Sequence, residues 1–237
     1  MKKLLTIVVC GQSDSERSDT IYDGAELVYA DGNLTNAVKQ AKGKYIIIEN
    51  RTFLFKDVQF FLDALETATQ DIVRFNGGNA YKNSLFKGVA DSENCFAYCT
   101  CATFNAKTVA YLEYAPFTLS AALWDYDSDE SGLLRVCGEF KRVKAKLSKE
   151  VYSFAFGLIC EKLIDFYMRS LIAIREKSVT PDRLAEFDKC LKDEIVLYLA
   201  LDKRFDNGAL QKIRKKGFKI SALTCRRYRK LLKKRDA

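Results

Sequence analysis

The sequence predicts an α/β protein in which a mostly parallel sheet is flanked by helices and followed by a helical C-terminal region. Strand-like and helix-like segments alternate through the first 75 residues, and apolar residues from about residue 150 onward recur at helical spacing. A chain of 237 residues with 48% hydrophobic and 30% charged residues is long and apolar enough for one sizeable core. We expect residues 1–142 to form the α/β domain and residues 143–237 the helical region with its basic tail, packed as one body.

Four short apolar runs predict buried strands at residues 4–9, 26–30, 45–48 and 71–75. The first run follows Met1-Lys2-Lys3, so it also resembles a secretory leader that ends at Cys10. However, the run is short, and bulky Val9 occupies a position where a leader requires a small residue. The strand is therefore the favoured interpretation, and no stretch of the sequence reaches the ~20 apolar residues of a membrane span.

Two of the segments between these strands are predicted to be helices. Residues 34–42 fit a short helix, and Gly43 stands where a glycine commonly ends one. Residues 56–66 carry an apolar stripe at i, i+3, i+4 and i+7, made by Val58, Phe61, Leu62 and Leu65. Alternation of this kind is typical of a parallel sheet covered by helices.

The C-terminal third is predicted to be helical. Residues 150–175 keep helical apolar spacing, and Thr180-Pro181-Asp182 combines a capping hydroxyl, an N-terminal proline and a favourable carboxylate. The buried stripe of this second helix would continue to a stop at Asn207-Gly208, through Leu184, Phe187, Leu191, Ile195 and Leu199. Residues 79–142 show no clear pattern.

The composition excludes several kinds of chemistry. No histidine occurs, so Ser-His-Asp and Cys-His catalysis are impossible. Eight cysteines are present, and Cys95, Cys99 and Cys101 lie close together, but a zinc site would need a further distant thiolate. We interpret the cysteines as small core residues, expect no metal ligands among them, and expect a reducing, cytoplasmic compartment.

Basic charge is concentrated at the C-terminus. Residues 203–237 contain fourteen Lys or Arg and two Asp, a net charge of +12, so the rest of this +8 chain carries about −4. Residues 212–235 interleave basic and apolar side chains. This pattern is consistent with a helix packed on the core, with peripheral contact to an anionic membrane, or with contact to nucleic-acid phosphates, and we rank the membrane above nucleic acid.

The residues Gly32 to Asn50 comprise a predicted helix and a predicted strand, which are joined by Ala41-Lys42-Gly43-Lys44-Tyr45-Ile46. This segment resembles family-2 glycosyltransferases, in which A-x-G-x-Y-I leads into the strand that carries a D-x-D motif. The helix at 57–66 and the strand at 71–75 resemble the next elements of that family. The resemblance covers about a third of the chain. It implies a reduced GT-A-like (Rossmann-like) fold, a nucleotide-sugar donor, a glycan or lipid-linked acceptor, and Mg²⁺ or Mn²⁺ bound at D-x-D.

The chain departs from the family at that motif. Its two aspartates fall on Asn50 and Thr52, with Arg51 between them, and Glu49 is the only neighbouring acid. Uncharged oxygens bind a hard divalent cation poorly, whereas a guanidinium can pair with a diphosphate directly. By resemblance, the candidate nucleotide-binding residues are Gln12, Asp31, Glu49, Asn50, Arg51 and Thr52. Asp31-Gly32 is also an ordinary turn sequence.

Asp125 and Asp127 are the candidate catalytic bases because Trp124 and Tyr126, which flank them, could stack on a sugar. The alternative is a solvated acidic loop formed with Asp129 and Glu130. Three functions remain open. The first is an active, metal-independent glycosyltransferase that modifies a cell-surface glycan. The second is a degenerate GT-A-like relative that has lost activity and binds a partner, nucleotide or glycan without turnover, and the third is a basic nucleic-acid-binding protein.

Overall fold

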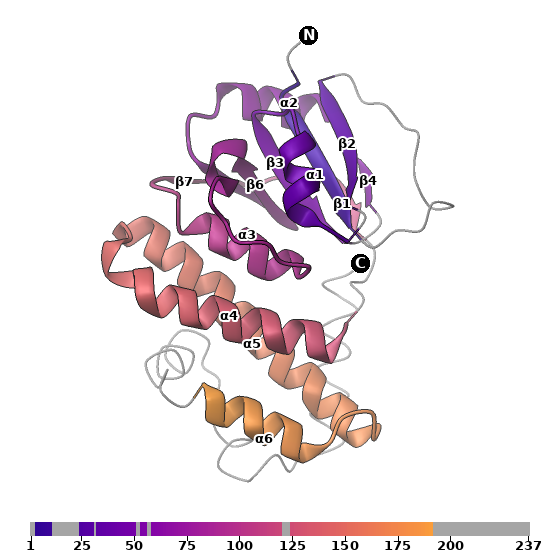
Figure 1. The fold of residues 1–237 in the computed structure, drawn as a ribbon. Coiled ribbons are helices and arrows are strands. Elements are labelled where there is room, and N and C mark those ends of the chain that lie inside the picture. Colours follow the sequence, from indigo (N-terminus) through magenta and orange to yellow (C-terminus); the bar gives the residue numbers. More distant parts are fainter. Residues whose placement is uncertain are drawn as a thin grey trace. The chain divides into compact units, whose positions relative to one another are not determined.

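The computed structural model describes residues 3–10, 24–30, 32–50, 53–55, 58–119 and 124–191 (Figure 1). The chain divides into two compact units: residues 1–124 with 139–155, and residues 125–138 with 156–237. None of the helices in the described ranges combines the length and the apolar character that crossing a membrane requires. The predicted helix stop at Asn207-Gly208, the residues Ile195 and Leu199, and the basic segment 212–235 lie outside these ranges.

The first unit is built on a six-stranded sheet in the order β2-β1-β3-β6-β5-β7. β1 pairs in parallel with β2 and β3, β5 pairs in parallel with β7, and β6 runs antiparallel between β3 and β5. The strands of this sheet are β1 (Leu5–Cys10), β2 (Ala25–Ala30), β3 (Tyr45–Glu49), β5 (Ile72–Phe75), β6 (Gly78–Lys82) and β7 (Val109–Leu112). A separate antiparallel pair consists of β4 (Phe53–Phe55) and β8 (Phe117–Leu119). The predicted α/β class with a mostly parallel sheet is confirmed.

β6 is one of four described strands that the sequence analysis did not predict, with β4, β7 and β8. It follows β5 through a two-residue turn at Asn76 and Gly77, where Gly77 adopts a φ of +103°. Asn-Gly is a typical two-residue hairpin sequence, and here Gly77 supplies the positive φ while Asn76 keeps a negative one. The reversal places β6 antiparallel in the sheet, and Phe75 pairs with Gly78 next to the turn.

Helices cover the sheet of the first unit on its two faces. α2 (Val58–Thr67) packs Phe61, Leu62 and Leu65 into a core with alternate residues of β1 and β3, including Leu5 and Ile7. α1 (Leu34–Gln40) packs on β1 and β2, and α3 (Cys95–Thr103) packs on β3 and on the 3₁₀ helix η2 (Asn83–Phe86). The predicted stripe of α2 is therefore confirmed as its buried face.

Gly43 has a different role from the predicted one. α1 ends at Gln40 with Ala41 as its C-cap, and Gly43 does not adopt positive φ. Instead Gly43 lies directly against β1, where an added Cβ would be 2.5 Å from the backbone nitrogen of Thr6. The prediction that Gly43 ends the helix was wrong: close approach of two backbones, and not a left-handed turn, explains this glycine.

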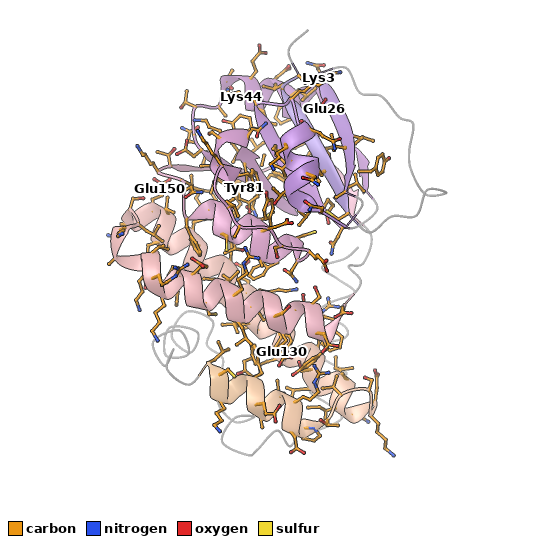
Figure 2. All side chains as sticks on the ribbon, in the orientation of Figure 1. Lys3, Glu26, Lys44, Tyr81, Glu130 and Glu150 are labelled. Carbon is orange, nitrogen blue, oxygen red and sulfur yellow. The ribbon has the colours of Figure 1, made fainter. Side chains whose placement is uncertain are left out.

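A relay of three hydrogen bonds holds the segment that connects α1 to β3. The Gly43 N–H donates to Thr6 Oγ1 at 2.8 Å, and the Thr6 hydroxyl donates to Glu26 Oε1 at 2.5 Å. Glu26 Oε1 also accepts from the Lys42 N–H at 2.5 Å. Glu26 stands on β2 (Figure 2), so the relay joins β1, β2 and the entry to β3 through one carboxylate.

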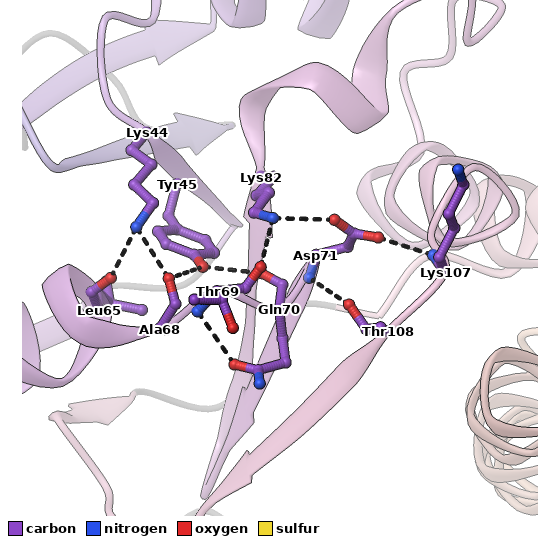
Figure 3. A network of polar contacts seen from close by, with 10 residues as sticks. All are labelled: Lys44, Tyr45, Leu65, Ala68, Thr69, Gln70, Asp71, Lys82, Lys107 and Thr108. Atoms are coloured by element: carbon purple, nitrogen blue, oxygen red, sulfur yellow. Dashed lines mark hydrogen bonds and ion pairs between the residues drawn. The ribbon is translucent and has the colours of Figure 1, made fainter.

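A second polar network binds the connection between α2 and β5 (Figure 3). Lys44 Nζ donates to carbonyl oxygens at the C-terminal end of α2, the closest being Ala68 O at 2.9 Å, where a cation suits the helix dipole. Lys82 Nζ donates to Thr69 O at 2.6 Å and to Asp71 Oδ1 at 3.1 Å. Burial alone would raise the pKa of Asp71, but the Lys107 N–H at 2.8 Å and the Lys82 ammonium lower it.

The second unit is helical. It contains the first part of α4 (Tyr126–Val143), most of α5 (Lys149–Arg175) and α6 (Pro181–Cys190). The 3₁₀ helix η3 (Lys144–Lys146), which links α4 to α5, belongs to the first unit. The rings of Phe166 and Phe187 lie 4.5 Å apart in its core. α5 matches the predicted helix at 150–175, and α6 begins at Pro181 as predicted.

Replacing Gly43 with alanine tests the close backbone approach. We expect Gly43→Ala to lower the free energy of unfolding by about 2 kcal/mol or more, because the added Cβ would displace β3 from β1. The matched change Gly138→Ala lies in α4, where the Cβ would meet nothing within 4 Å, and we expect a gain of about 0.5–1 kcal/mol. Urea denaturation measures both, and equal stability of Gly43→Ala and wild type would contradict the packing.

Replacing Asp71 with asparagine tests the second network. Because the folded pKa of Asp71 is lowered, its stabilisation is complete above the unfolded pKa of about 3.9 and is lost as pH falls through the folded value. We expect Asp71→Asn to cost about 1–2 kcal/mol at pH 7 and progressively less below about pH 4. Denaturation curves across this pH range should show no such effect for Glu66→Gln, an exposed acid on α2.

Candidate functional site

The order of strands indicates where a ligand would bind. β1 lies between β2 and β3, so the chain passes from β1 to one neighbour and then crosses through α1 to the other. In open α/β sheets, ligands bind outside the carboxyl ends of the strands at such a reversal. The carboxyl ends of β1 and β3 are Cys10 and Glu49, and these residues mark the candidate site.

Glu49 is a buried carboxylate at this edge. Its residue is only 6% exposed, and one carboxylate oxygen accepts a hydrogen bond from the Asn50 N–H at 3.0 Å. Asn50 itself is exposed. Acidic side chains are seldom buried without a hydrogen bond, and the Asn50 N–H supplies one to Glu49.

Thiols from two elements gather beside Glu49. Cys10 at the end of β1 is hydrogen-bonded to Cys95, the first residue of α3, and Cys99 lies one turn further along that helix. The hydrogen bond to Cys95, burial and the nearby negative charges, Glu49 included, raise the pKa of Cys10. Burial, with Cys95 and Glu49 nearby, raises the pKa of Cys99 well above its ordinary value. Cys10 and Cys99 therefore stay protonated at neutral pH, which makes them poor metal ligands and poor nucleophiles.

The donor groups at this edge do not fit Mg²⁺ or Mn²⁺. The predicted motif supplies the Glu49 carboxylate and the Asn50 amide where the resembling family has paired aspartates. Within the described ranges, no cluster of three or more His, Cys, Asp or Glu side chains could hold a metal ion. Hard divalent cations require several oxygen ligands, preferably charged ones, so we derive no chemistry here through a bound metal.

The structure places two of the six predicted nucleotide-binding residues at this edge, namely Glu49 and Asn50. The other four lie outside the described residues, and their assignment stays a prediction: Gln12, Asp31, Arg51 and Thr52. Sequence reasoning treated Cys95 only as a core cysteine. The signal for its real position was Asn94, a good N-cap residue, whose side chain accepts from the Ala97 N–H at 2.9 Å and starts α3.

The start of α3 is anchored to α1 by a further set of polar contacts. Thr35 Oγ1 on α1 donates to Asp91 Oδ1 at 2.8 Å, in the segment that leads into α3. The Tyr98 hydroxyl on α3 is hydrogen-bonded to Thr35, while burial raises the pKa of this tyrosine. These contacts fix the N-terminal part of α3 and thereby position Cys95.

The predicted catalytic acids belong to the second unit, and they lie at the start of a helix. Asp125 Oδ1 accepts from the Ser128 N–H at 2.8 Å and caps α4, so the solvated loop considered as an alternative is not what forms here. Asp127 lies in the first helical turn, where carboxylates suit the helix dipole, and accepts a hydrogen bond from Arg183 of α6. Its side chain nevertheless remains 75% exposed.

Cationic side chains of α5 and α6 neutralise the rest of this acidic cluster. Lys162 Nζ lies 2.7 Å from Asp129 Oδ2, and Arg183 lies 3.3 Å from Glu130 Oε2 and 4.5 Å from the centre of the Tyr126 ring. Burial and the Glu130 carboxylate raise the pKa of Tyr126 to about 12. The cluster thus has a structural role, and the proposed catalytic role of Asp125 and Asp127 stays a prediction.

Comparisons with known proteins give a distant likeness. No protein-family model and no curated protein matches the chain. Among solved structures, it is similar to the crystal structure of S. aureus TarS, a family-2 glycosyltransferase, with 11% identity and a TM-score of 0.46. The matched region covers 68% of this chain and 43% of that one, so this chain spans less than half of that protein's length. This likeness concerns the fold alone, and the six-stranded mixed sheet is itself consistent with the predicted reduced GT-A-like domain.

Proposed function

We propose that the chain binds a nucleotide-sugar at the carboxyl ends of β1 and β3, without a divalent metal, and transfers the sugar to a glycan or lipid-linked acceptor. The observation that carries this proposal is the buried Glu49 carboxylate at the reversal point of the sheet, next to Asn50. The resemblance of residues 32–50 to family-2 glycosyltransferases supports the choice of ligand.

The chemistry of Glu49 favours contact with a hydroxyl group of the ligand. Without a cation between them, a carboxylate and a diphosphate repel each other. A carboxylate is by contrast a strong acceptor for ribose or sugar hydroxyls. We therefore assign Glu49 to a hydroxyl of the nucleotide-sugar, and Arg51, two residues further along the sequence, to the diphosphate.

The transfer step requires a base for the acceptor hydroxyl. We assign this role to Asp127, with Asp125 as the alternative, because the exposed Asp127 carboxylate is accessible to an acceptor. The carboxylate takes the hydroxyl proton, the acceptor oxygen bonds to the anomeric carbon, and the bond from that carbon to the diphosphate oxygen breaks. The nucleoside diphosphate leaves with the electron pair of that bond.

The acceptor side of the proposal concerns the basic segment 212–235. Its net positive charge and interleaved apolar residues would suit peripheral contact with an anionic membrane, where lipid-linked and cell-envelope acceptors occur. A chain acting there would be cytoplasmic and peripheral to the membrane. The competing function is a non-catalytic protein that binds the same nucleotide-sugar without turnover.

Donor binding is tested by thermal shift against UDP, GDP, CDP and UDP-sugars, each with Mn²⁺ and with EDTA. We expect one nucleotide class to stabilise the chain equally in both buffers, by about 2.7 kcal/mol at a hundredfold excess over Kd. Glu49→Gln should weaken that affinity roughly tenfold or more, whereas Glu66→Gln at an exposed position of α2 should leave it unchanged. No change in Tm with any nucleotide would refute the proposal. A change in Tm seen only with Mn²⁺ would refute its metal-independent form.

The base is tested by replacing Asp127 with asparagine. We expect Asp127→Asn to lower the transfer rate by roughly 10²- to 10⁴-fold while the donor affinity stays constant. Glu130→Gln is the matched control, because it also removes an acidic partner of Arg183 but no proposed base. Equal losses in the two variants would assign Asp127 to structure alone, and donor binding without any transfer by the wild type would favour the non-catalytic protein.

A further inference from the structure

Phe60 is an exposed aromatic residue in the first turn of α2. It is 50% exposed, although the next residue, Phe61, is fully buried in the core. Among the residues that the structure describes, Phe60 and Tyr111 are the two large hydrophobic side chains with such exposure. A single exposed ring is ordinary by itself, so the surroundings of Phe60 decide what it can do.

A second aromatic ring lies against Phe60. The centre of the Tyr114 ring is 4.7 Å from that of Phe60, and the two planes make an angle of 58°. Tyr114 packs on the core that α2 covers, and its carbonyl oxygen accepts a hydrogen bond from the Asn76 N–H at 2.9 Å. Its own N–H donates to Leu112 O at 2.8 Å. We call Phe60 and Tyr114 the aromatic pair; core packing and two backbone hydrogen bonds hold it in place before any ligand arrives.

The aromatic pair lies at the same edge of the sheet as Glu49. β6 runs antiparallel to both β3 and β5, and β7 is parallel to β5, so the carboxyl ends of β3, β5 and β7 share one edge. Tyr114 follows β7 at that edge by two residues. On α2, Phe61 packs edge-on at 5.1 Å against Phe75, the last residue of β5. β5 stands two strand spacings, or about 10 Å, from β3, so a ligand on the pair would lie beside one at Glu49.

The polar surroundings favour an uncharged ligand that is rich in hydroxyl groups. Both acids of α2 and Glu113 are exposed, and α2 contains no basic residue. These carboxylates repel phosphate groups, so nucleic acid and anionic lipid fit poorly here. Asp63, one turn after Phe60, accepts a hydrogen bond from Gln59 at 2.7 Å, and a carboxylate can accept further bonds from hydroxyls. A sugar combines hydroxyls with an apolar C–H face that packs on an aromatic ring.

The exposed apolar surface is too small for a protein partner. Tyr111 is in register with Arg74, which alternates along β5 with the core residues Val73 and Phe75. The Tyr111 side chain therefore lies on the face of the sheet opposite α2, and it does not extend the surface at Phe60. A specific protein interface buries roughly 800 Å² on each partner, whereas the aromatic pair offers a surface about the size of one sugar ring.

We propose that the aromatic pair is a subsite for a neutral sugar unit of the glycan acceptor, with the C–H face of the sugar on the Phe60 ring and its hydroxyls toward Asp63. The word acceptor rests on the proposed function, but sugar binding itself requires neither a nucleotide nor transfer. A sugar held here would direct the next unit of the same glycan toward the carboxyl end of β3. Binding energy from a unit that does not react would then orient the one that does.

The subsite is tested by saturation-transfer NMR on the full-length chain without nucleotide, using maltotriose, cellotriose and triacetylchitotriose as probes. We expect at least one trisaccharide to bind with a Kd in the millimolar range. Phe60→Ala should weaken that binding by about tenfold, and Phe60→Tyr, which keeps the ring, should retain most of it. Tyr111→Ala is the matched control, because it removes an exposed ring from the opposite face and should change nothing. Phe60→Leu keeps an apolar side chain without a ring and replaces Phe60→Ala if that variant does not fold.

The contrary outcomes are distinct from failure of the donor site. The subsite is refuted if the wild type binds none of the trisaccharides, or if Phe60→Ala and Phe60→Leu bind them as the wild type does. Self-association of the wild type that Phe60→Ala abolishes, measured by sedimentation, would assign the pair to contact between copies. Nucleotide stabilisation without sugar binding would leave the donor site standing and remove the subsite. Sugar binding without any nucleotide response would do the reverse.

Discussion

The close approach of β3 to β1 at Gly43 is the constraint on which the first unit depends. Two backbones meet there with no room for a side chain, and Glu26 joins the meeting point to β2 through Thr6 and Lys42. This contact sets the register in which β1 lies between β2 and β3. The same register brings the ends of β1 and β3 to one edge, so the position of Cys10 and Glu49 follows from a contact at the opposite end of the strands.

Local pattern was sufficient to predict much of this architecture. Apolar runs predicted β1, β2, β3 and β5 to within a residue or two, and the stripe of Phe61 and Leu65 predicted α2. These elements are readable because burial imposes a period of two on a strand and of 3.6 on a helix. β6 was not predicted, although Asn76-Gly77 after an apolar run is a typical hairpin turn and could have indicated it.

Contacts between distant residues account for what the sequence could not predict. Gly43 fits a helix-ending pattern, and only its contact with Thr6 shows the different reason for a glycine there. The sequence shows Asp127 as an acidic residue, but it could not predict the hydrogen bond that Asp127 accepts from Arg183 of α6. For the candidate site, the sequence predicted Glu49 and Asn50 through a family resemblance, but nothing in local spacing could bring Cys95 to Cys10.

The chain leaves the first unit just before α4, returns to it within α4 and leaves it again within α5, with consequences for the order in which a nascent chain can fold. Residues 139–155 belong to the first unit, where the Glu150 carboxylate of α5 accepts a hydrogen bond from the Val109 N–H at 2.8 Å and Phe154 lies against Arg74 (Figure 2 labels Glu150). During synthesis from the N-terminus, the first unit is therefore complete only once these residues have left the ribosome. Residues 125–138 of the second unit precede this segment and residues 156–237 follow it, so the two units are completed as interleaved segments of one polypeptide and not one after the other.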